Sequence, residues 1–188
     1  LGVDFLSASA HKFHGPKGIG FLYASSMDFD SYLHGGEQEQ KKRAGTENIA
    51  AIVAMVAALK EDLDKQAENL DYVQKLFNSF LSDMEGISFY LNNAENHLPY
   101  VLNIGFPGQK NDLLLLRLDL AGISISTGSA CTAGIIQSSH VLEAMYGKHS
   151  ERLKESVRIS LSPQNTIEEL QYLSKTLKEI IGGSHNGV

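Results

Sequence analysis

Short apolar runs and longer helical repeats alternate along the chain, and the first two runs predict a β-hairpin. Residues 3–9 and 19–24 are apolar stretches of strand length. The turn pairs Gly15-Pro16 and Lys17-Gly18 lie between them. The chain therefore opens on two strands whose connection is rich in glycine and in basic residues.

The longest helical repeat extends from Asn48 to about Asp83. Its apolar residues recur at intervals of three and four positions, the spacing of a helix that buries one face. Thr46 is expected to cap its start, and Gly86 lies just beyond its end. Because a helix of this length is unusual in a single domain, we expect it to bend or break at a domain boundary near residues 64–69.

The rest of the chain alternates between strands and helices. Thr166 and Glu169 have the spacing of a capping box, which marks the start of the last helix. The expected strands are residues 87–92, 100–106, 123–126 and 157–161, and the expected helices are residues 112–121, 138–146 and 167–181, followed by a disordered tail at 184–188.

Composition narrows the classes of function. The 188 residues include 16 Lys and Arg against 22 Asp and Glu, a net charge of −6. There is no basic stripe of the kind that binds nucleic acid or an anionic membrane. No apolar run approaches the roughly 18 residues of a membrane span. The single cysteine excludes an intrachain disulfide framework and favours a reducing, cytoplasmic compartment.

The first residues, Leu1-Gly2-Val3-Asp4, lead directly into an apolar run without a methionine or a signal-peptide pattern. A strand without an upstream neighbour has unpaired edges and little to pack on. We therefore expect the chain to be a fragment of a longer protein.

The connection of the predicted hairpin is the first candidate for chemistry. In Ser9-Ala10-His11-Lys12, the lysine leaves an apolar strand at a point where we expect a fixed backbone and little solvent. Desolvation and a neighbouring cation make a lysine nucleophilic, so that it can form a Schiff base with a carbonyl cofactor. Ser9 and His11 add donors for a phosphate group. The alternative is a solvated turn, and the Gly-Lys-Ser/Thr ending of a P-loop is missing.

Cys131 is the second candidate, because it lies among small residues in the segment 127–134. A thiol in an exposed loop can reach a substrate and then carry a product to another protein, once it ionises. The alternative is a small buried hydrophobic residue, as most free cysteines are. No metal site is expected, because no zinc-ligand spacing links the cysteine to His97, His140 or His149.

Two more segments contain candidate anion-binding groups. The polar loop at residues 37–46 ends in Thr46, whose hydroxyl and neighbouring N–H groups can bind an anion at a helix start; the alternative is an ordinary helix cap. Arg158 lies on an apolar strand and needs a carboxylate or phosphate partner. The alternatives are an intraprotein salt bridge or a strand edge that faces solvent.

Five segments occur in an order that resembles one enzyme family. They are Ser-Ala-His-Lys-Phe-His-Gly-Pro-Lys-Gly at 9–18, Arg-Ala-Gly-Thr-Glu-Asn at 43–48, Ser-Thr-Gly-Ser-Ala-Cys-Thr-Ala-Gly at 126–134, Ser-His-Val-Leu at 139–142 and Val-Arg-Ile-Ser-Leu at 157–161. Together they are similar to the NifS/IscS-like cysteine desulfurases, pyridoxal-phosphate enzymes of fold type I in the class V aminotransferase group. The resemblance covers essentially the whole chain.

The resemblance implies an α/β fold with two domains. Residues 1–65 match the C-terminal part of the large domain that binds pyridoxal 5'-phosphate. Residues 66–188 match the small α+β C-terminal domain that carries the cysteine loop.

The same resemblance implies roles for the cofactor residues. Lys12 matches the lysine that holds pyridoxal phosphate, and Ser9 and His11 match residues around the cofactor phosphate. Thr46 matches a threonine that reaches the phosphate bound by the neighbouring subunit, which implies a homodimer.

The implied reaction is the removal of sulfur from L-cysteine. Arg158 matches the arginine that binds the substrate carboxylate, and Lys12 acts as the base. Cys131 matches the cysteine that receives the sulfur as a persulfide while L-alanine is released. The persulfide then passes to a sulfur-acceptor protein, either an iron–sulfur scaffold or a tRNA-thiolating enzyme, without direct contact with nucleic acid.

The chain departs from the family in length, because the family's N-terminal half has no counterpart here. That half supplies the histidine that stacks on the cofactor ring and the aspartate at its pyridine nitrogen. We therefore expect the 188 residues alone to bind the cofactor poorly and to be inactive or slow. Two alternatives are a non-catalytic fragment that keeps dimer or acceptor contacts and a relative that acts on selenocysteine or cysteine sulfinate.

Overall fold

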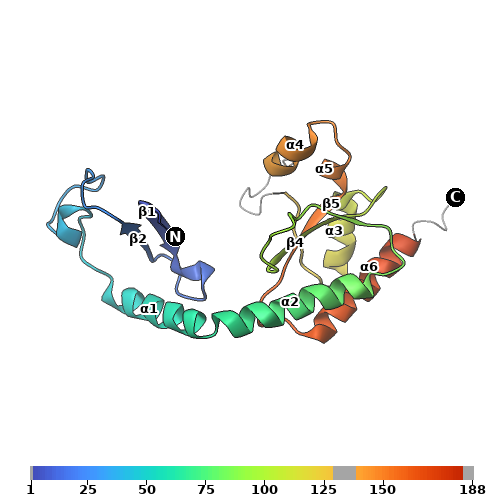
Figure 1. Ribbon diagram of the computed structural model, residues 1–188, viewed down its shortest axis with the longest axis horizontal. Helices are drawn as coiled ribbons and strands as arrows, with labels where there is room; N and C mark the ends of the chain where they lie inside the picture. Colours follow the sequence, from blue (N-terminus) through green and yellow to red (C-terminus); the bar gives the residue numbers. More distant parts are fainter. Residues whose placement is uncertain (1, 129–138, 184–188) are drawn as a thin grey trace. The chain divides into compact units, whose positions relative to one another are not determined.

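The computed structural model describes residues 2–128 and 139–183, and Figure 1 shows its helices and strands. The chain divides into two compact units, Leu1–Gln66 and Ala67–Val188. Cys131, most of the predicted loop at 127–134 and the predicted tail at 184–188 lie outside the described residues.

The first unit opens on the predicted hairpin. Strands β1 (Phe5–Ser9) and β2 (Gly20–Ala24) pair antiparallel along their whole length, so this prediction is confirmed. Their connection begins with a short 3-10 helix, η1 (Ala10–Lys12), in which Ala10 is completely buried. The Ala10 N–H donates to the carbonyl oxygen of Ile19 at 2.9 Å and closes the hairpin just beyond the strand ends.

The loop after the hairpin leads into the first long helix. It contains a second 3-10 helix, η2 (Glu39–Lys41), with left-handed backbone angles at all three residues. Helix α1 (Ile49–Asp64) begins at Asn48, whose side-chain oxygen accepts a hydrogen bond from the Ala51 N–H at 3.2 Å. The prediction that Thr46 caps this helix is wrong, because the capping oxygen comes from a residue two positions later.

Helix α1 leaves most of its apolar face uncovered within this unit. Met55 is its buried residue. Ile49, Val53, Val56 and Leu63 occupy helical positions that predict a buried face, yet they are 55–63% exposed. Since the rest of the described unit is a two-stranded hairpin and a polar loop, it has too little apolar surface to cover this helix.

The long helical repeat breaks at Lys65, as expected, and continues as α2 (Gln66–Asp83). In this second half most of the large apolar side chains are buried or half-buried, in contrast to α1, although Leu70 is exposed. The buried residues of α2 are Val73, Leu76, Phe77 and Phe80. Beyond the end of the helix, Gly86 adopts a φ of 88°, a conformation that favours glycine.

The second unit contains a three-stranded antiparallel sheet in the order β3-β4-β5. Its strands are β3 (Tyr90–Leu91), β4 (Val101–Gly105) and β5 (Ser156–Ser160). The strand predicted at 87–92 is thus shortened to two paired residues. The strand predicted at 123–126 is wrong, because only Ser126 pairs, in a single bridge with Arg158.

Alternation along the strands gives this sheet two different faces. The apolar face carries Leu91, Leu102, Ile104, Val157 and Ile159. The opposite face, called the polar face below, carries Tyr90, Asn92, Asn103, Ser156 and Arg158. Gly105 is required on the polar face, because a Cβ atom there would collide with the ring of Tyr90 on the neighbouring strand.

Helices lie on both sides of this sheet, as Figure 1 shows, with α2 and α6 on one side and α4 and α5 on the other. The helices of the unit after α2 are α3 (Asn111–Leu120), α4 (His140–Tyr146), α5 (Arg152–Glu155) and α6 (Ile167–Gly183). Residues of α2, α3 and α6 form one continuous core with the apolar face. Helix α5 was not expected from the sequence.

The predicted capping box at the start of α6 is confirmed. The Thr166 N–H donates to the Glu169 side chain at 3.1 Å, and the Glu169 N–H donates to the Thr166 hydroxyl at 3.2 Å. Asn165 also donates to the Glu169 carboxylate. These hydrogen bonds, first the one from Asn165, hold the pKa of Glu169 below its ordinary value.

Across residues 2–128 and 139–183, every helix is too short or too polar to span a lipid bilayer.

Candidate active site

The predicted lysine site lies at the end of β1. Ser9 ends the strand, and His11 and Lys12 lie on η1, with all three side chains exposed. The expectation that solvent is scarce at Lys12 is wrong for this unit. The reason is local, because η1 turns Ala10 into the interior and leaves its other two residues on the outer side of the turn.

The groups at this site are available to a ligand. Ser9 is the N-cap of η1, yet its hydroxyl makes no capping hydrogen bond. Nearby, His14 Nδ1 lies 3.1 Å from the Asp62 carboxylate and so connects the end of this turn to α1. A hydroxyl, an imidazole and an amine thus lie within four residues, on a turn fixed to both the hairpin and the helix.

In the segment before α1, Arg43 and Gly45 form hydrogen bonds, and the described residues leave the Thr46 hydroxyl open. The Gly45 N–H donates to the Gln38 side chain at 3.1 Å, and the Arg43 guanidinium donates to the carbonyl oxygen of Ala44. Thr46 is exposed, and since Asn48 caps the helix, the Thr46 hydroxyl is not used for that purpose. Among the described residues it has no hydrogen-bond partner.

Arg158 is half-buried in the polar face, in the middle of β5. Its Nε–H donates to the Ser126 hydroxyl at 3.1 Å, and backbone hydrogen bonds join the same two residues in both directions. Within the part of the chain that the structure describes, Arg158 forms no ion pair with a carboxylate. The alternative of an intraprotein salt bridge therefore has no support in the described residues.

A buried polar network next to Arg158 was not found from the sequence. The Asn92 side-chain amide donates to Asn103 at 2.8 Å and to the Ser156 hydroxyl at 2.9 Å, and Asn92 is only 7% exposed. The Asn111 side chain, at the start of α3, donates to the carbonyl oxygens of Leu153 and Ser156. These hydrogen bonds connect α3 and the α5 segment to the sheet.

Arg152 completes this network. Its Nη1 donates to the Asn92 side-chain oxygen at 2.8 Å. Its guanidinium carbon lies 4.1 Å from the ring centre of Tyr90 and 4.5 Å from that of Tyr146, so that the cation contacts two aromatic rings. Burial raises the pKa of Tyr90, whose hydroxyl donates to Glu155 at 3.1 Å. The C-terminal end of α4 is thereby connected to the polar face.

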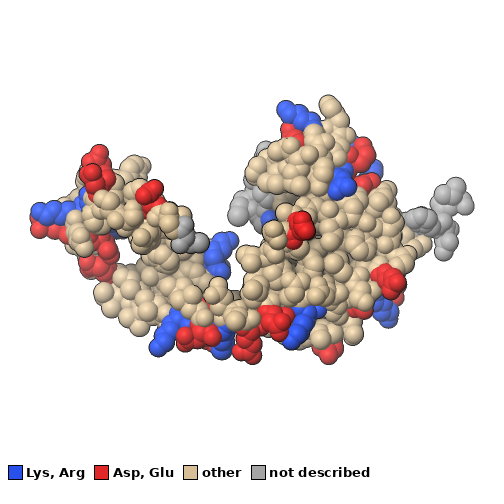
Figure 2. All heavy atoms as spheres, in the orientation of Figure 1, with Lys and Arg blue, Asp and Glu red and all other residues tan. Residues whose placement is uncertain are grey.

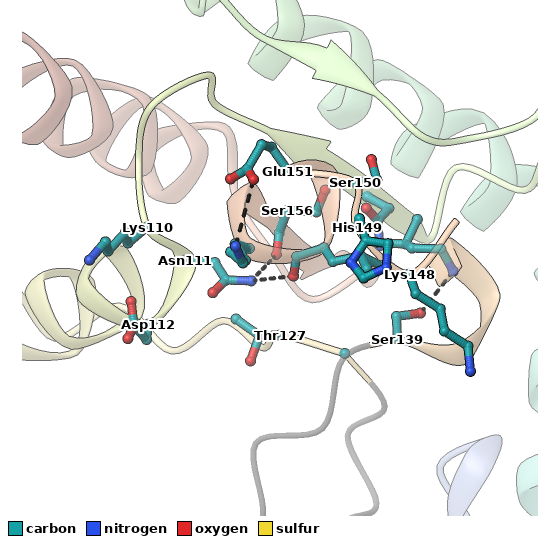
Figure 3. A pocket seen from close by; sticks show the side chains of 15 residues that line it. Lys110, Asn111, Asp112, Thr127, Ser139, Lys148, His149, Ser150, Glu151 and Ser156 are labelled. Atoms are coloured by element: carbon teal, nitrogen blue, oxygen red, sulfur yellow. Dashed lines mark hydrogen bonds and ion pairs between the residues drawn. The ribbon is translucent and has the colours of Figure 1, made fainter. Parts of the chain in front are cut away.

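A cavity of about 760 Å³ opens beside this network (Figure 3). Asn111 and Ser156 lie on one wall, with Lys110, which precedes α3, and Asp112 of α3 nearby, and Ser139 and Lys148 lie on the opposite side. Thr127 and Ser139 both line the cavity, and in the sequence they flank the stretch 129–138 that contains Cys131.

The surface has no region dominated by one charge on the face shown in Figure 2, where acidic and basic side chains are interspersed. Most of the ion pairs among the described residues join neighbouring turns of one helix or loop, such as Lys75 with Asp71.

The expected site residues thus fall into separate groups. Ser9, His11, Lys12 and Thr46 belong to the first unit, Arg158 belongs to the second, and Cys131 lies outside the described residues.

Comparisons with known proteins place the chain in a family. Residues 1–173 match the family model described as aminotransferase class-V. The chain is 45% identical over 184 residues to the putative cysteine desulfurase IscS 1 of Bacillus subtilis, covering 95% of this chain and 48% of that protein. It is 41% identical to the cysteine desulfurase IscS of Dictyoglomus turgidum, covering 96% of this chain and 47% of that protein.

Solved structures agree on the fold. A NifS-like protein matches with a TM-score of 0.84 and 33% identity, over 97% of this chain and 47% of its own. The NifS-like protein of Rickettsia africae matches with a TM-score of 0.81 and 30% identity, over 96% of this chain and 48% of its own.

The chain spans about half the length of the curated relatives it matches. The expected fold and the resemblance to NifS/IscS-like cysteine desulfurases are confirmed by these matches. With 173 of its 188 residues inside the family model, the chain belongs to the aminotransferase class-V family.

Proposed function

We propose that this chain is the C-terminal half of a cysteine desulfurase, which removes sulfur from L-cysteine and releases L-alanine. One observation supports the proposal above all others. The family match over residues 1–173 includes both Lys12 and Cys131, and the relatives that cover this range are named cysteine desulfurases.

The residues of the first unit fit the cofactor of this family, pyridoxal phosphate. An exposed amine at Lys12 suits an aldehyde, and the unused hydroxyls of Ser9 and Thr46 suit a phosphate. His11 adds an imidazole. When bound, this cofactor supplies an electron sink that makes the bonds around the substrate α-carbon labile. In the proposed protein, residues 1–65 belong to the large cofactor domain and residues 66–188 form the small domain.

Each proposed catalytic group has one task. Arg158 binds the substrate carboxylate through its guanidinium and so orients the amino acid. The amine of Lys12 takes up the α-proton. The Cys131 thiolate attacks the substrate sulfur, so that a sulfur–sulfur bond forms at Cys131 while the carbon–sulfur bond of the substrate breaks.

The proposal extends to partners and place of action. Thr46 contacts the cofactor phosphate of a second subunit, so that the protein acts as a homodimer. A sulfur-acceptor protein receives the persulfide from Cys131. The cytoplasmic location expected from the single cysteine stays a prediction, which cell fractionation tests.

The test uses the complete reading frame that encodes this chain. We expect the protein supplied with pyridoxal phosphate and L-cysteine to form alanine, and Lys12→Ala and Cys131→Ser to lower the rate by at least about 100-fold. Lys17→Ala is the matched control, because Lys17 is an exposed lysine of the same connection. Borohydride reduction followed by peptide mapping should place the cofactor on Lys12.

The outcomes separate the alternatives. No cofactor on Lys12 in the folded protein would remove the desulfurase proposal. Cofactor on Lys12 with turnover of selenocysteine or cysteine sulfinate, but not of cysteine, would change the substrate. Alkylation followed by peptide mapping, which shows that Cys131 is modified, and then by the same assay shows whether the thiol is needed.

A further inference from the structure

The guanidinium of Arg158 is held by Ser126, the first residue of the segment 126–134, for which the sequence predicted no role of its own. Ser126 and Arg158 form an isolated bridge, in which the Ser126 N–H donates to the Arg158 carbonyl oxygen at 3.1 Å. The Arg158 N–H donates back to Ser126 at 2.6 Å. On top of this backbone pair, the Ser126 hydroxyl accepts the Arg158 Nε–H at 3.1 Å. The serine is thus fixed by its backbone at the point where its side chain meets the guanidinium.

This contact decides which edge of the guanidinium is available. A guanidinium binds a carboxylate with two parallel hydrogen bonds, either through Nε and one Nη or through both Nη groups. The hydrogen bond to Ser126 uses the Nε–H, so the first arrangement is blocked. The two Nη groups remain, and the described residues offer them no carboxylate partner.

We propose that Ser126 is a positioning residue for the substrate carboxylate: by holding the Arg158 Nε–H, it directs the carboxylate to the end of the guanidinium formed by the two Nη groups. This inference rests on the proposed function, because it takes an amino-acid carboxylate as the ligand of Arg158. Ser126 itself does not touch the substrate. Its effect is to reduce the number of orientations that the guanidinium must give up on binding.

The test compares Ser126→Ala with Ser126→Thr in the complete reading frame, with L-cysteine as substrate. Loss of one hydrogen bond to a charged group should raise KM about tenfold while kcat stays within about twofold, because binding is weakened equally in the ground state and the transition state. Threonine keeps the hydroxyl and should restore KM to near the wild-type value. Ser124→Ala is the matched control, since Ser124 is an exposed serine two positions away.

A second ligand separates positioning from a general loosening of the fold. Cysteamine has the amine and thiol of cysteine but no carboxylate. Its inhibition constant should be unchanged in Ser126→Ala if the serine acts through Arg158 on the carboxylate. Equal weakening of cysteine and cysteamine would overturn the proposal, and so would an unchanged KM for cysteine.

The Arg158–Ser126 contact can also be followed without turnover. In protein labelled with ¹⁵N-arginine, the Arg158 Nε proton should exchange with water more slowly in the wild type and in Ser126→Thr than in Ser126→Ala. Equal exchange in all three proteins would overturn the inference while leaving the proposed function intact. A wild-type protein that protects this proton but forms no alanine would instead contradict the proposed function, and the carboxylate role of Ser126 with it.

Discussion

Replacing Arg152 by alanine tests the buried polar network of the second unit. Arg152 makes three contacts that alanine removes, namely the hydrogen bond to Asn92 at 2.8 Å and the stacking on Tyr90 and Tyr146. The substitution also leaves the Asn92 side-chain oxygen without its charged donor in a site where Asn92 is 7% exposed.

The size of the effect follows from these contacts. A hydrogen bond from a charged donor contributes about 1.5–3 kcal/mol, and each cation–ring contact adds about 0.5–1 kcal/mol. Folding also restricts the rotamers of Arg152, and alanine avoids this entropy cost, which offsets up to about 2 kcal/mol of the lost contacts. We therefore expect Arg152→Ala to lower the free energy of unfolding of the second unit by about 2–3 kcal/mol. Arg152→Lys keeps the charge but loses the planar stacking, and should cost about half as much.

Urea unfolding followed by far-UV circular dichroism measures this change, because the chain has no tryptophan for fluorescence. Lys154→Ala is the matched control. Lys154 lies on the same short helix, is 72% exposed and forms only a surface ion pair with Glu151 at 3.6 Å, so its loss should cost less than about 0.5 kcal/mol. If Arg152→Ala were no more destabilising than this control, the network would contribute nothing and the reasoning from its geometry would fail.

Three further predictions concern other parts of the chain. Phe80→Ala removes a fully buried ring from the core of the second unit and should lower its free energy of unfolding by about 3–5 kcal/mol in the same urea assay. A change confined to the unfolding of the first unit would contradict the assignment of Phe80 to this core. Glu169→Gln tests the capping box by pH: the depressed pKa of Glu169 means that its carboxylate stabilises α6 above the ordinary value of 4.5 and loses this effect as the pH falls through the lower folded value. The wild type should therefore exceed the variant in melting temperature at neutral pH and approach it in acid, and a difference that grows in acid would refute this. Hydrogen exchange should be fast in β1 and β2 and slow in β4 and α6, because in the described part of the first unit only Ala10 and Met55 are buried apolar residues; equal protection of both sheets, seen by mass spectrometry, would contradict this.

Elements set by local chemistry could be predicted from the sequence. The hairpin followed from two apolar runs around a Gly-Pro turn, and the capping box followed from the spacing of Thr166 and Glu169. The break at Lys65 followed from the length of the helical repeat. In each case the residues that decide the structure lie in one continuous segment of the chain.

Elements set by distant contacts could not be predicted in this way. Arg152 and Asn92 are 60 residues apart, and nothing in their spacing shows that they meet. Thr46 and Asn48 are both good capping residues, and the sequence alone does not show which of them caps α1. The backbone geometry places Asn48 at the N-cap position. The apolar positions of α1 predict a buried face, and a buried face requires a second surface that packs on it. The described unit contains no surface that covers Ile49 or Val53.

The position of Arg158 depends on the core as much as on Ser126. Its neighbours in β5, Val157 and Ile159, are 1% and 4% exposed and lie on the apolar face, so alternation places Arg158 on the opposite face. A shift of the strand by one residue would bury the charge and expose both apolar side chains, which makes the register strongly specified. The hydrophobic core thus determines the face on which the guanidinium lies, and Ser126 determines which of its edges is open. These two constraints come from different parts of the chain, and under the proposed function they leave Arg158 one arrangement for binding the substrate carboxylate.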